Sequence, residues 1–407
     1  MSTTEQAAAG GDRTTGQYSS AWRRVRLWAG AHAVDDLYQG LIPAAVPYFV
    51  LQRHFSYVEA SGLVLAATLG SALPQLAVGF LADRHRLPWL APLGVSLAGT
   101  GAGLAGLAPC YPLVFALLLL SGLGVAMFHP PAGREVRCAA GGATAMGYFA
   151  AGGSIGFFVA PAIATPVLDG LGIGATALFI PPAVLTGFVL LRHQRRSAAT
   201  AATAARGSGA DRPALFAVLT FVEIVRSVVS FGLATFVSLY WIRHLGASAA
   251  LGGTALTLEL GGGVLGTLAG ARIAARIGPV RTVQLGNALL VPALIALLAC
   301  GSKYGALTLV LVVGLVANIP FAVLAKLGQD YLPTRPSTAA GVTFGLSVSA
   351  GGLFMPLLGL VADHSGPRGV FVVLALIPLI AVAISTALRE PASGRGEHPA
   401  RDRWRAP

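Results

Sequence analysis

The sequence predicts an all-α integral membrane protein with twelve transmembrane helices in two pseudo-symmetric six-helix halves. Of its 407 residues, 55% are hydrophobic and only 11% are charged, whereas about 25% are charged in ordinary soluble domains. Apolar runs recur from Trp28 to Leu388, and each is long enough to cross a hydrocarbon core of about 30 Å. A soluble core could not bury so many such segments.

Short breaks that contain arginine or proline delimit the expected helices. In an N-terminal half, residues 24–191, they are residues 24–50, 58–82, 88–108, 112–130, 143–168 and 171–191. In a C-terminal half, residues 214–390, they are residues 214–242, 248–273, 280–300, 304–328, 337–362 and 368–389.

Three segments lie outside these halves. Residues 1–23 are expected to be an N-terminal tail, followed by a first span that acts as an uncleaved signal anchor. Residues 192–213 are rich in Ala, Thr, Ser and Arg and lack an apolar helical face, which is typical of a flexible linker. Residues 391–407 are rich in Pro, Gly and Arg and are expected to be disordered.

The basic residues indicate the orientation of the chain. An even number of helices puts both termini on one side, and most of the 28 basic residues fall there or in the linker. The opposite loops hold only Arg53, Arg243, Lys303 and Arg368. The positive-inside rule therefore places termini and linker in the cytoplasm of a multi-pass inner (plasma) membrane protein. This placement, rather than nucleic-acid binding, explains the net charge of +12.

The two halves resemble each other in sequence. Ala151-Gly152-Gly153 recurs as Ala350-Gly351-Gly352, and each triplet is followed by a proline. The exit of the second helix, residues 79–84, has a weaker copy at residues 271–281. Chance similarity between Gly/Ala-rich segments is the alternative, but two matches in like-oriented halves favour a parallel repeat.

These segments resemble motifs of the major facilitator superfamily. Gly79-x-x-x-Asp83-Arg84 is similar to its cytoplasmic loop motif, and Ala275 stands at the aspartate position of the second copy. The fifth helix, with Gly147, Gly156 and Ala160-Pro161, is similar to the superfamily's antiporter motif. The resemblance implies the major facilitator fold, in which two halves rock about a central cavity and expose it to alternate sides.

Within the superfamily, the chain most resembles the fosmidomycin-resistance family of proton-coupled exporters. The matching residues are His32-x-x-x-Asp36, Phe128-His129-Pro130, Arg226-Ser227 and Gly359-x-x-x-Asp363. One departure is Pro131, where that family often has a glutamate. The resemblance covers most of residues 28–390 and implies efflux of an antibiotic-like compound, driven by the proton gradient without any other cofactor.

The first helix carries three candidate proton-coupling residues, His32, Asp35 and Asp36. His32 and Asp36 are four residues apart and therefore share one helix face. Burial disfavours a charged carboxylate, so we expect Asp36 to exchange protons, with His32 as its neighbour or relay. A His–Asp hydrogen bond that only fastens the helix is the alternative. Asp35 points elsewhere on the helix.

Two acidic residues of the C-terminal half, Glu223 and Glu259, are further proton-coupling candidates. Glu223 and Arg226 are three apart in one helix and could neutralise each other permanently. In the functional alternative, protonation of Glu223 frees Arg226 to bind an anionic substrate group bidentately, and proton and substrate compete. Glu259 is expected to face the cavity, although an interhelical hydrogen bond is also possible.

Two uncharged polar residues and a cluster at the loops complete the candidate sites. His129 and Asn318 are candidate substrate contacts, although His129 precedes Pro130-Pro131, which we expect to end its helix, and a histidine there is typical of a structural cap. Asp83, Arg84 and Arg276 are expected to form a conformational latch between the halves at the cytoplasmic exits.

The sequence thus favours a monomeric, proton-coupled exporter of a small polar or anionic compound. An importer of a nutrient or metabolite on the same fold is the first alternative. A membrane-embedded enzyme or sensor is the second, but no H-E-x-x-H cluster or soluble signalling domain accompanies the helices. We expect no catalytic residues, no metal site and no nucleic-acid partner. Cys110, Cys138 and Cys300 are too dispersed in the sequence to suggest a disulfide or metal site.

Overall fold

Helices make up nearly all of the described part of the computed structural model, which covers residues 3–85, 87–140, 143–196, 210–335, 339, 342–343 and 347–391. The N-terminal half contains α1 (Thr3–Gln52), α2 (Tyr57–Arg84), α3 (Leu90–Ala105), α4 (Tyr111–Ala140), α5 (Ala143–Leu171), the 3₁₀ helix η1 (Ile173–Phe179) and α6 (Ile180–Arg196). The C-terminal half contains α7 (Pro213–Arg243), α8 (Ala249–Ile277), α9 (Pro279–Ala299), α10 (Gly305–Asn318), α11 (Phe321–Tyr331), α13 (Ser347–Leu353) and α14 (Met355–Ser385).

We assign the twelve expected membrane crossings to the helices that the structure describes. Eight helical spans are both long and apolar enough to cross a bilayer, and the last of them, Ala350–Ser385, leaves the helical conformation at Gly366 and so consists of two segments. Helices α1, α3 and α8 supply the remaining crossings. The expected all-α membrane fold is therefore confirmed.

Local sequence signals explain several helix ends. Ser56 accepts a hydrogen bond from the Glu59 backbone, and the Glu59 carboxylate caps Ser56 in return, which is the capping box that begins α2. At the start of α8, the Ser248 side chain accepts a hydrogen bond from the Leu251 backbone amide. Between α8 and α9, Gly278 adopts a positive φ of 92°, and Pro279 begins the next helix.

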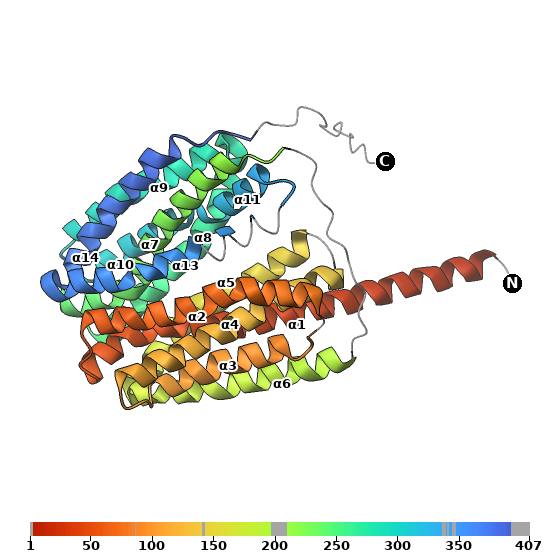
Figure 1. The fold of residues 1–407 in the computed structure, drawn as a ribbon, viewed down its shortest axis with the longest axis horizontal. Helices are drawn as coiled ribbons and strands as arrows, with labels where there is room; N and C mark the ends of the chain where they lie inside the picture. The colour runs from red at the N-terminus through yellow and green to blue at the C-terminus, as the bar shows by residue number, and fades with distance from the viewer. Residues whose placement is uncertain are drawn as a thin grey trace.

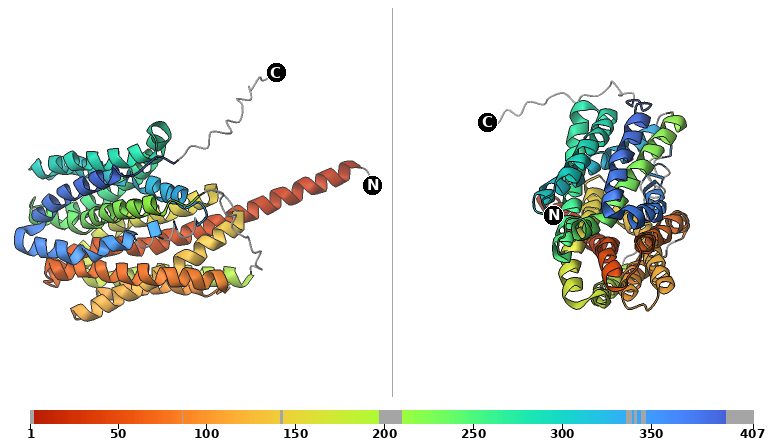
Figure 2. Two further views of the ribbon diagram at one scale, coloured as in Figure 1. Left: turned by 45° about the horizontal axis from the view of Figure 1, so that its top comes forward. Right: turned by 90° about the vertical axis from the view of Figure 1, so that its left-hand side faces the viewer.

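Figure 1 shows the two halves side by side, with α1–α6 in the lower bundle and α7–α14 in the upper one. The start of α1, the end of α6 and the start of α7 lie at the same end of the molecule, which we call the terminal end. Figure 2 shows the N-terminal part of α1 projecting beyond the bundle at this end. Within the bundle, α1 packs mainly on α5, and α7 packs on α13 and α14.

The halves meet most closely away from the terminal end. Asp363 accepts backbone hydrogen bonds from Tyr57 and Val58 at the start of α2, with N···O distances of 2.8 and 3.1 Å. Gly359 packs against Ser61, and Gly352 packs against Thr68. Helix α2 of one half is therefore joined to α13 and α14 of the other, away from the terminal end.

The helices differ from the expected ones at three boundaries and at one division of a helix. Helix α4 does not end at Pro130-Pro131 but continues to Ala140, so it includes Cys138. Proline is tolerated there because neighbouring helices and side chains in a membrane bundle satisfy the freed backbone groups. Helix α1 begins at Thr3, well inside the expected tail, and α6 runs into the expected linker as far as Arg196. The tenth expected helix divides into α10 and α11 because Pro320 has no amide hydrogen.

Two expected segments lie largely outside the described residues. These are residues 197–209 of the linker and residues 392–407 of the C-terminal tail. The start of the eleventh expected helix falls there as well, since the continuous description resumes at residue 347.

Candidate functional site

Helices α1 and α5 fix the position of His32. Its Nδ1 atom lies 2.7 Å from the Phe149 carbonyl oxygen of α5, and its ring stacks on the Phe149 ring at 4.0 Å. Because a carbonyl oxygen can only accept, Nδ1 must carry the hydrogen. The other ring nitrogen, Nε2, lies 3.2 Å from Asp36 Oδ2, in keeping with the shared helix face of the two residues.

His129 of α4 approaches the same two side chains. Its Nε2 atom lies 3.0 Å from His32 Nε2 and 3.3 Å from Asp36 Oδ1. We call these three residues, His32, Asp36 and His129, the α1–α4 cluster. Since α4 continues past its two prolines, His129 lies within a helix and not at its end. The donor atoms of the cluster lie within 4.8 Å of one another, close enough to hold one proton or one small cation.

Asp35 lies beside this cluster but makes different contacts. Its side chain is 0% exposed, and neither carboxylate oxygen has a hydrogen-bond partner in the described structure. The nearest charged partner is His129 Nδ1, at 3.5 Å from Asp35 Oδ2. An ionised carboxylate buried in this way is costly unless it is paired, so Asp35 and His129 depend on each other electrostatically.

Glu223 and Arg226 form a buried ion pair on α7. Their side chains are only 2% and 4% exposed, and Arg226 Nη2 and Nε lie 2.7 and 3.1 Å from the two Glu223 oxygens. Arg226 Nη1 donates to Ser230 Oγ at 3.1 Å, and the guanidinium carbon lies 4.9 Å from the centre of the Phe321 ring. The pair is formed in this conformation, and the guanidinium retains further N–H donors.

Glu259 of α8 is a buried carboxylate without such a partner. Its side chain is nearly inaccessible, and its Oε2 atom accepts no hydrogen bond from the described residues. Asn318 lies one helix away, where its Nδ2 donates to the Gly314 carbonyl oxygen at 3.0 Å and lies against Gly263 of α8. The side-chain amide of Asn318 therefore packs on α8, where α8 and α10 are in contact.

The sequence-predicted residues thus form three separate groups inside the bundle. They are the α1–α4 cluster with Asp35, the Glu223–Arg226 pair, and Glu259 near Asn318. Sequence reasoning missed Gln39, which donates to Asp36, and Ser230, which accepts from Arg226. Both lie one helical turn from their partners, a spacing that could have revealed them. The Phe149 carbonyl left no sequence signal because it is a backbone group.

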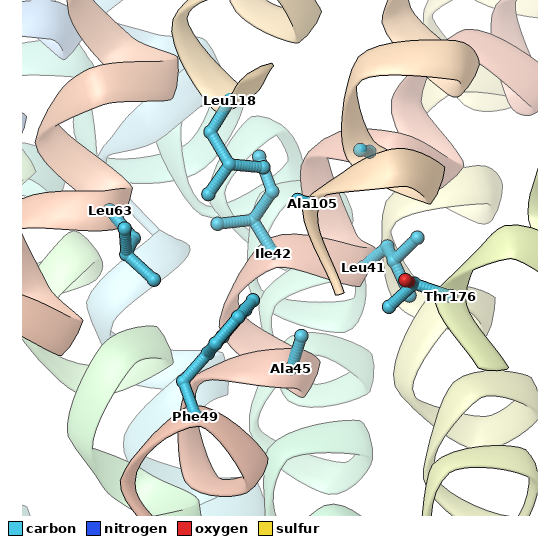
Figure 3. Close-up of a pocket in the computed structure, with 9 residues that line it drawn as sticks. Leu41, Ile42, Ala45, Phe49, Leu63, Ala105, Leu118 and Thr176 are labelled. Atoms are coloured by element: carbon cyan, nitrogen blue, oxygen red, sulfur yellow. The ribbon is translucent and has the colours of Figure 1, made fainter. Parts of the chain in front are cut away.

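The apolar cavity in Figure 3 lies elsewhere. It has a volume of about 10 Å³ and is lined by α1, α2, α3, α4 and η1, with Thr176 as its polar residue. The Thr176 hydroxyl donates to the Gly103 carbonyl oxygen, so this cavity presents no ionisable group and is not a candidate site.

The expected latch is not formed by the side chains that the structure describes. Arg84 is exposed, and its guanidinium carbon lies 3.9 Å from the Phe80 ring of its own helix. Arg276 is also exposed at the end of α8. The Asp83 side chain lies outside the described ones, so the latch stays a prediction.

A family model described as the Major Facilitator Superfamily matches residues 29–352 and 219–407. The chain belongs to this superfamily. It is therefore a multi-pass membrane transporter and not an enzyme.

Two curated relatives match nearly the whole of this superfamily member. The fosmidomycin resistance protein of Escherichia coli (strain K12) is 26% identical over 93% of this chain and 96% of its own length. An uncharacterized MFS-type transporter of Bacillus subtilis (strain 168), YfnC, is 27% identical over 86% of this chain and 89% of its own length. The first of these supports the resemblance seen in the sequence.

Solved structures share the fold at low sequence identity. A bacterial homolog of the human lysosomal transporter Spinster, crystallised in an inward-facing and occupied conformation, superposes with a TM-score of 0.75. It is 15% identical, over 89% of this chain and 95% of that chain. A D-xylose–proton symporter gives a TM-score of 0.71 at 11% identity, over 92% and 99% of the two chains. These likenesses support the fold alone.

Proposed function

We propose that this transporter is a proton-coupled exporter of a small polar or anionic antibiotic-like compound, working by alternating access in the inner membrane with cytoplasmic termini. The observation that carries the proposal is the buried Glu223–Arg226 pair, with its 2.7 Å contact, in a helix that also crosses the membrane. An ionised pair at such depth is costly and is therefore typical of a substrate or ion site. The fosmidomycin resistance relative supports an antibiotic-like cargo.

Arg226 is the proposed anion-binding residue. A guanidinium binds a carboxylate or phosphate with two parallel hydrogen bonds, and Arg226 already binds Glu223 in this way. An anionic substrate must replace Glu223, and protonation of Glu223 assists this replacement. Ser230 and Phe321 hold the guanidinium in place from the same helix and from α11.

Exchange against protons requires a second site. By linkage, protonation of Glu223 and anion binding at Arg226 favour each other, so this pair by itself does not give the competition between proton and substrate that the sequence suggested. We therefore propose that this competition arises between the halves. The α1–α4 cluster lies in the other half and contains two imidazoles and a carboxylate. In our proposal, the transporter reorients with either a proton at this cluster or substrate at Arg226, but not with both.

The experiment is transport by the purified full chain in liposomes that contain a trapped pH indicator. Fosmidomycin and a panel of phosphonates, carboxylates and neutral compounds of similar size are the probes. A probe that is exported should drive protons in the opposite direction. Asp36→Asn is expected to abolish this coupling, and Arg226→Ala is expected to reduce transport of anionic probes more than of neutral ones.

Two substitutions outside the candidate site serve as controls. Asp330→Asn breaks a surface pair with Lys326, and Arg272→Ala removes an exposed arginine of α8; both variants should transport normally. Unchanged coupling in Asp36→Asn would remove that residue from the mechanism. Protons and probe moving in the same direction would show an importer instead.

A further inference from the structure

The hydrogen bonds of the two imidazoles in the α1–α4 cluster define their tautomers. His32 Nδ1 faces the Phe149 carbonyl oxygen at 2.7 Å, and His129 Nδ1 faces the Val125 carbonyl oxygen at 3.0 Å. Neither carbonyl can donate, so each Nδ1 carries a hydrogen. Both rings therefore present Nε2 to the rest of the cluster, and a neutral ring has only a lone pair there.

The contacts between these Nε2 atoms require a hydrogen. The two atoms lie 3.0 Å apart, and they lie 3.2 and 3.3 Å from the two oxygens of Asp36. With both rings neutral and Asp36 ionised, two lone pairs and a negative charge would face one another. One added proton supplies the missing N–H donor and makes the three groups electrically neutral together. A second added proton would place two N–H groups against each other.

We propose that His32 and His129 share a single proton between their Nε2 atoms, with the Asp36 carboxylate as its counter-ion. His129 is then a proton-binding residue rather than a substrate contact. That this proton is the one exchanged during transport rests on the proposed function; that the cluster holds it does not.

The surroundings of the cluster fit a ligand as small as a proton. From α1, Gln39 donates to Asp36, and Asp35 lies 3.5 Å from His129 Nδ1. From α5, the cluster meets the Phe149 ring and the backbone at Gly153, where an added Cβ atom would overlap Asp36 Oδ2 and lie 2.6 Å from His32 Nε2. The titratable groups that face the shared proton are therefore those of α1 and α4, among the side chains that the structure describes.

Nitrogen NMR of the histidine rings tests the shared proton directly. The full chain would be labelled with ¹⁵N-histidine and placed in lipid nanodiscs near neutral pH. We expect one cationic imidazole signature distributed over His32 and His129, with their Nδ1 atoms protonated. In His32→Gln and in His129→Gln, the remaining ring should become neutral and keep its hydrogen on Nδ1. His54→Gln, at an exposed position, is the control and should leave the signature unchanged.

Three results would overturn the assignment. They are two neutral rings in the unsubstituted protein, a His32 ring that stays cationic in His129→Gln, and a cationic signature that is replaced by metal-bound shifts and returns only after EDTA treatment. The last result would identify a metal site. A variant that loses the fold would be recognised by its other histidine signals, and Asp36→Asn would then test the counter-ion with both rings present.

Transport separates this assignment from the proposed function. If the two imidazoles act as one site, the His32→Gln/His129→Gln double variant should lose no more proton coupling than either single variant. A shared-proton signature in a protein without proton-driven transport would sustain the site and refute the proposed function. Proton-driven transport without that signature would refute the site and leave coupling to Glu223 or Glu259.

Discussion

At the scale of the residue, the same kind of group occurs in different electrostatic situations. Asp36 contacts two imidazoles, Glu223 contacts a guanidinium, and Glu259 has a buried oxygen without any partner among the described residues. Burial of a charge is tolerated only when a partner compensates it. Protonation therefore has a different effect near each acid. Beside Asp36 it supplies the proton that the two imidazoles share, at Glu223 it weakens an ion pair, and at Glu259 it removes an isolated charge.

For Glu223, the pair geometry predicts how pH affects anion binding. Glu223→Gln mimics the protonated acid and weakens its hold on Arg226 by removing a charge-assisted hydrogen bond, which contributes about 1.5 kcal/mol. Affinity for an anionic probe should rise about tenfold, and its pH dependence should disappear. In the unsubstituted protein, affinity should fall as pH rises and Glu223 ionises. Calorimetric titration at several pH values measures both effects.

Ser230→Ala is the matched control for Glu223→Gln. It removes the Ser230 hydroxyl, which is another hydrogen-bond partner of Arg226. Unlike the Glu223 carboxylate, this hydroxyl does not exchange a proton with pH. Affinity should change in this variant, whereas its pH dependence should be kept. Equal pH dependence in Glu223→Gln and the unsubstituted protein would show that Glu223 does not control the anion site.

For Glu259, the lack of a partner predicts opposite effects on stability and coupling. Glutamine at position 259 cannot ionise, so Glu259→Gln avoids an uncompensated buried charge, and thermal stability should be unchanged or higher. Proton-driven transport should nevertheless fall if the carboxylate exchanges protons. Glu135→Gln is the comparison for a carboxylate that has a partner, because it breaks the 3.2 Å pair with Arg24 at the terminal end. A lower melting temperature for Glu259→Gln, with coupling intact, would indicate a purely structural acid.

At the scale of the helix, glycines determine how closely the helices that carry the site approach each other. Gly152 of α5 lies against the backbone of Ala29 in α1, and Gly351 of α13 lies against Ser227 in α7. These glycines belong to the two repeated triplets and make corresponding contacts in the two halves. The repeat in the sequence is therefore a repeat of helix contacts, which supports a common origin of the pattern over chance.

Gly156 gives the clearest test of this close packing. A Cβ atom at Gly156 would overlap the Ala33 carbonyl oxygen of α1, whereas Gly147 of the same helix has nothing within 4 Å. Gly156→Ala should therefore cost about 1–3 kcal/mol through overpacking and displace α5, which holds His32. Gly147→Ala should be neutral or stabilising because alanine favours helices. Thermal unfolding of both variants measures the difference; equal stability would contradict the packing argument.

At the scale of the whole molecule, the two halves are joined at the end opposite to the termini. There the Asp363 carboxylate accepts from the first amides of α2, where the helix dipole also favours a negative charge. At the terminal end, the described side chains of Arg84 and Arg276 are exposed instead. This asymmetry is what a rocking transporter requires in one of its two states.

Removal of the Asp363 carboxylate should shift the balance between these states. In Asp363→Ala, the amides of Tyr57 and Val58 lose their partner, so the contact between α2 and α14 should open more often. A cysteine at Ser61, which is buried against Gly359, should then react faster with a soluble thiol reagent, in a background without the three natural cysteines. Glu59→Gln alters the same helix start without a contact across the halves and should leave the rate unchanged. An unaltered rate in Asp363→Ala would show that the Asp363 carboxylate does not hold α2 and α14 together at this end.

The sequence alone was enough to predict the membrane class, the superfamily and most of the helices. Long apolar runs and the breaks between them are local features, and a segment that crosses a bilayer must be apolar and long enough to span it. It also located the buried charged residues of the candidate site, since a charge within such a run is visible without any structure. It failed at Pro130-Pro131, because proline breaks helices in water but is tolerated where neighbouring helices satisfy the backbone.

Only the tertiary structure decided which of these residues meet. His129 is 97 residues from His32, and nothing local to either residue predicts their 3.0 Å contact, which depends on how α4 and α5 pack against α1. The Phe149 carbonyl is a backbone feature that the sequence does not mark, and the repeated triplet does not reveal that Gly153 lies against His32 and Asp36. Contacts between distant helices come from the packing of the whole bundle, and for that reason only the three-dimensional structure brings the residues of the proposed proton site together.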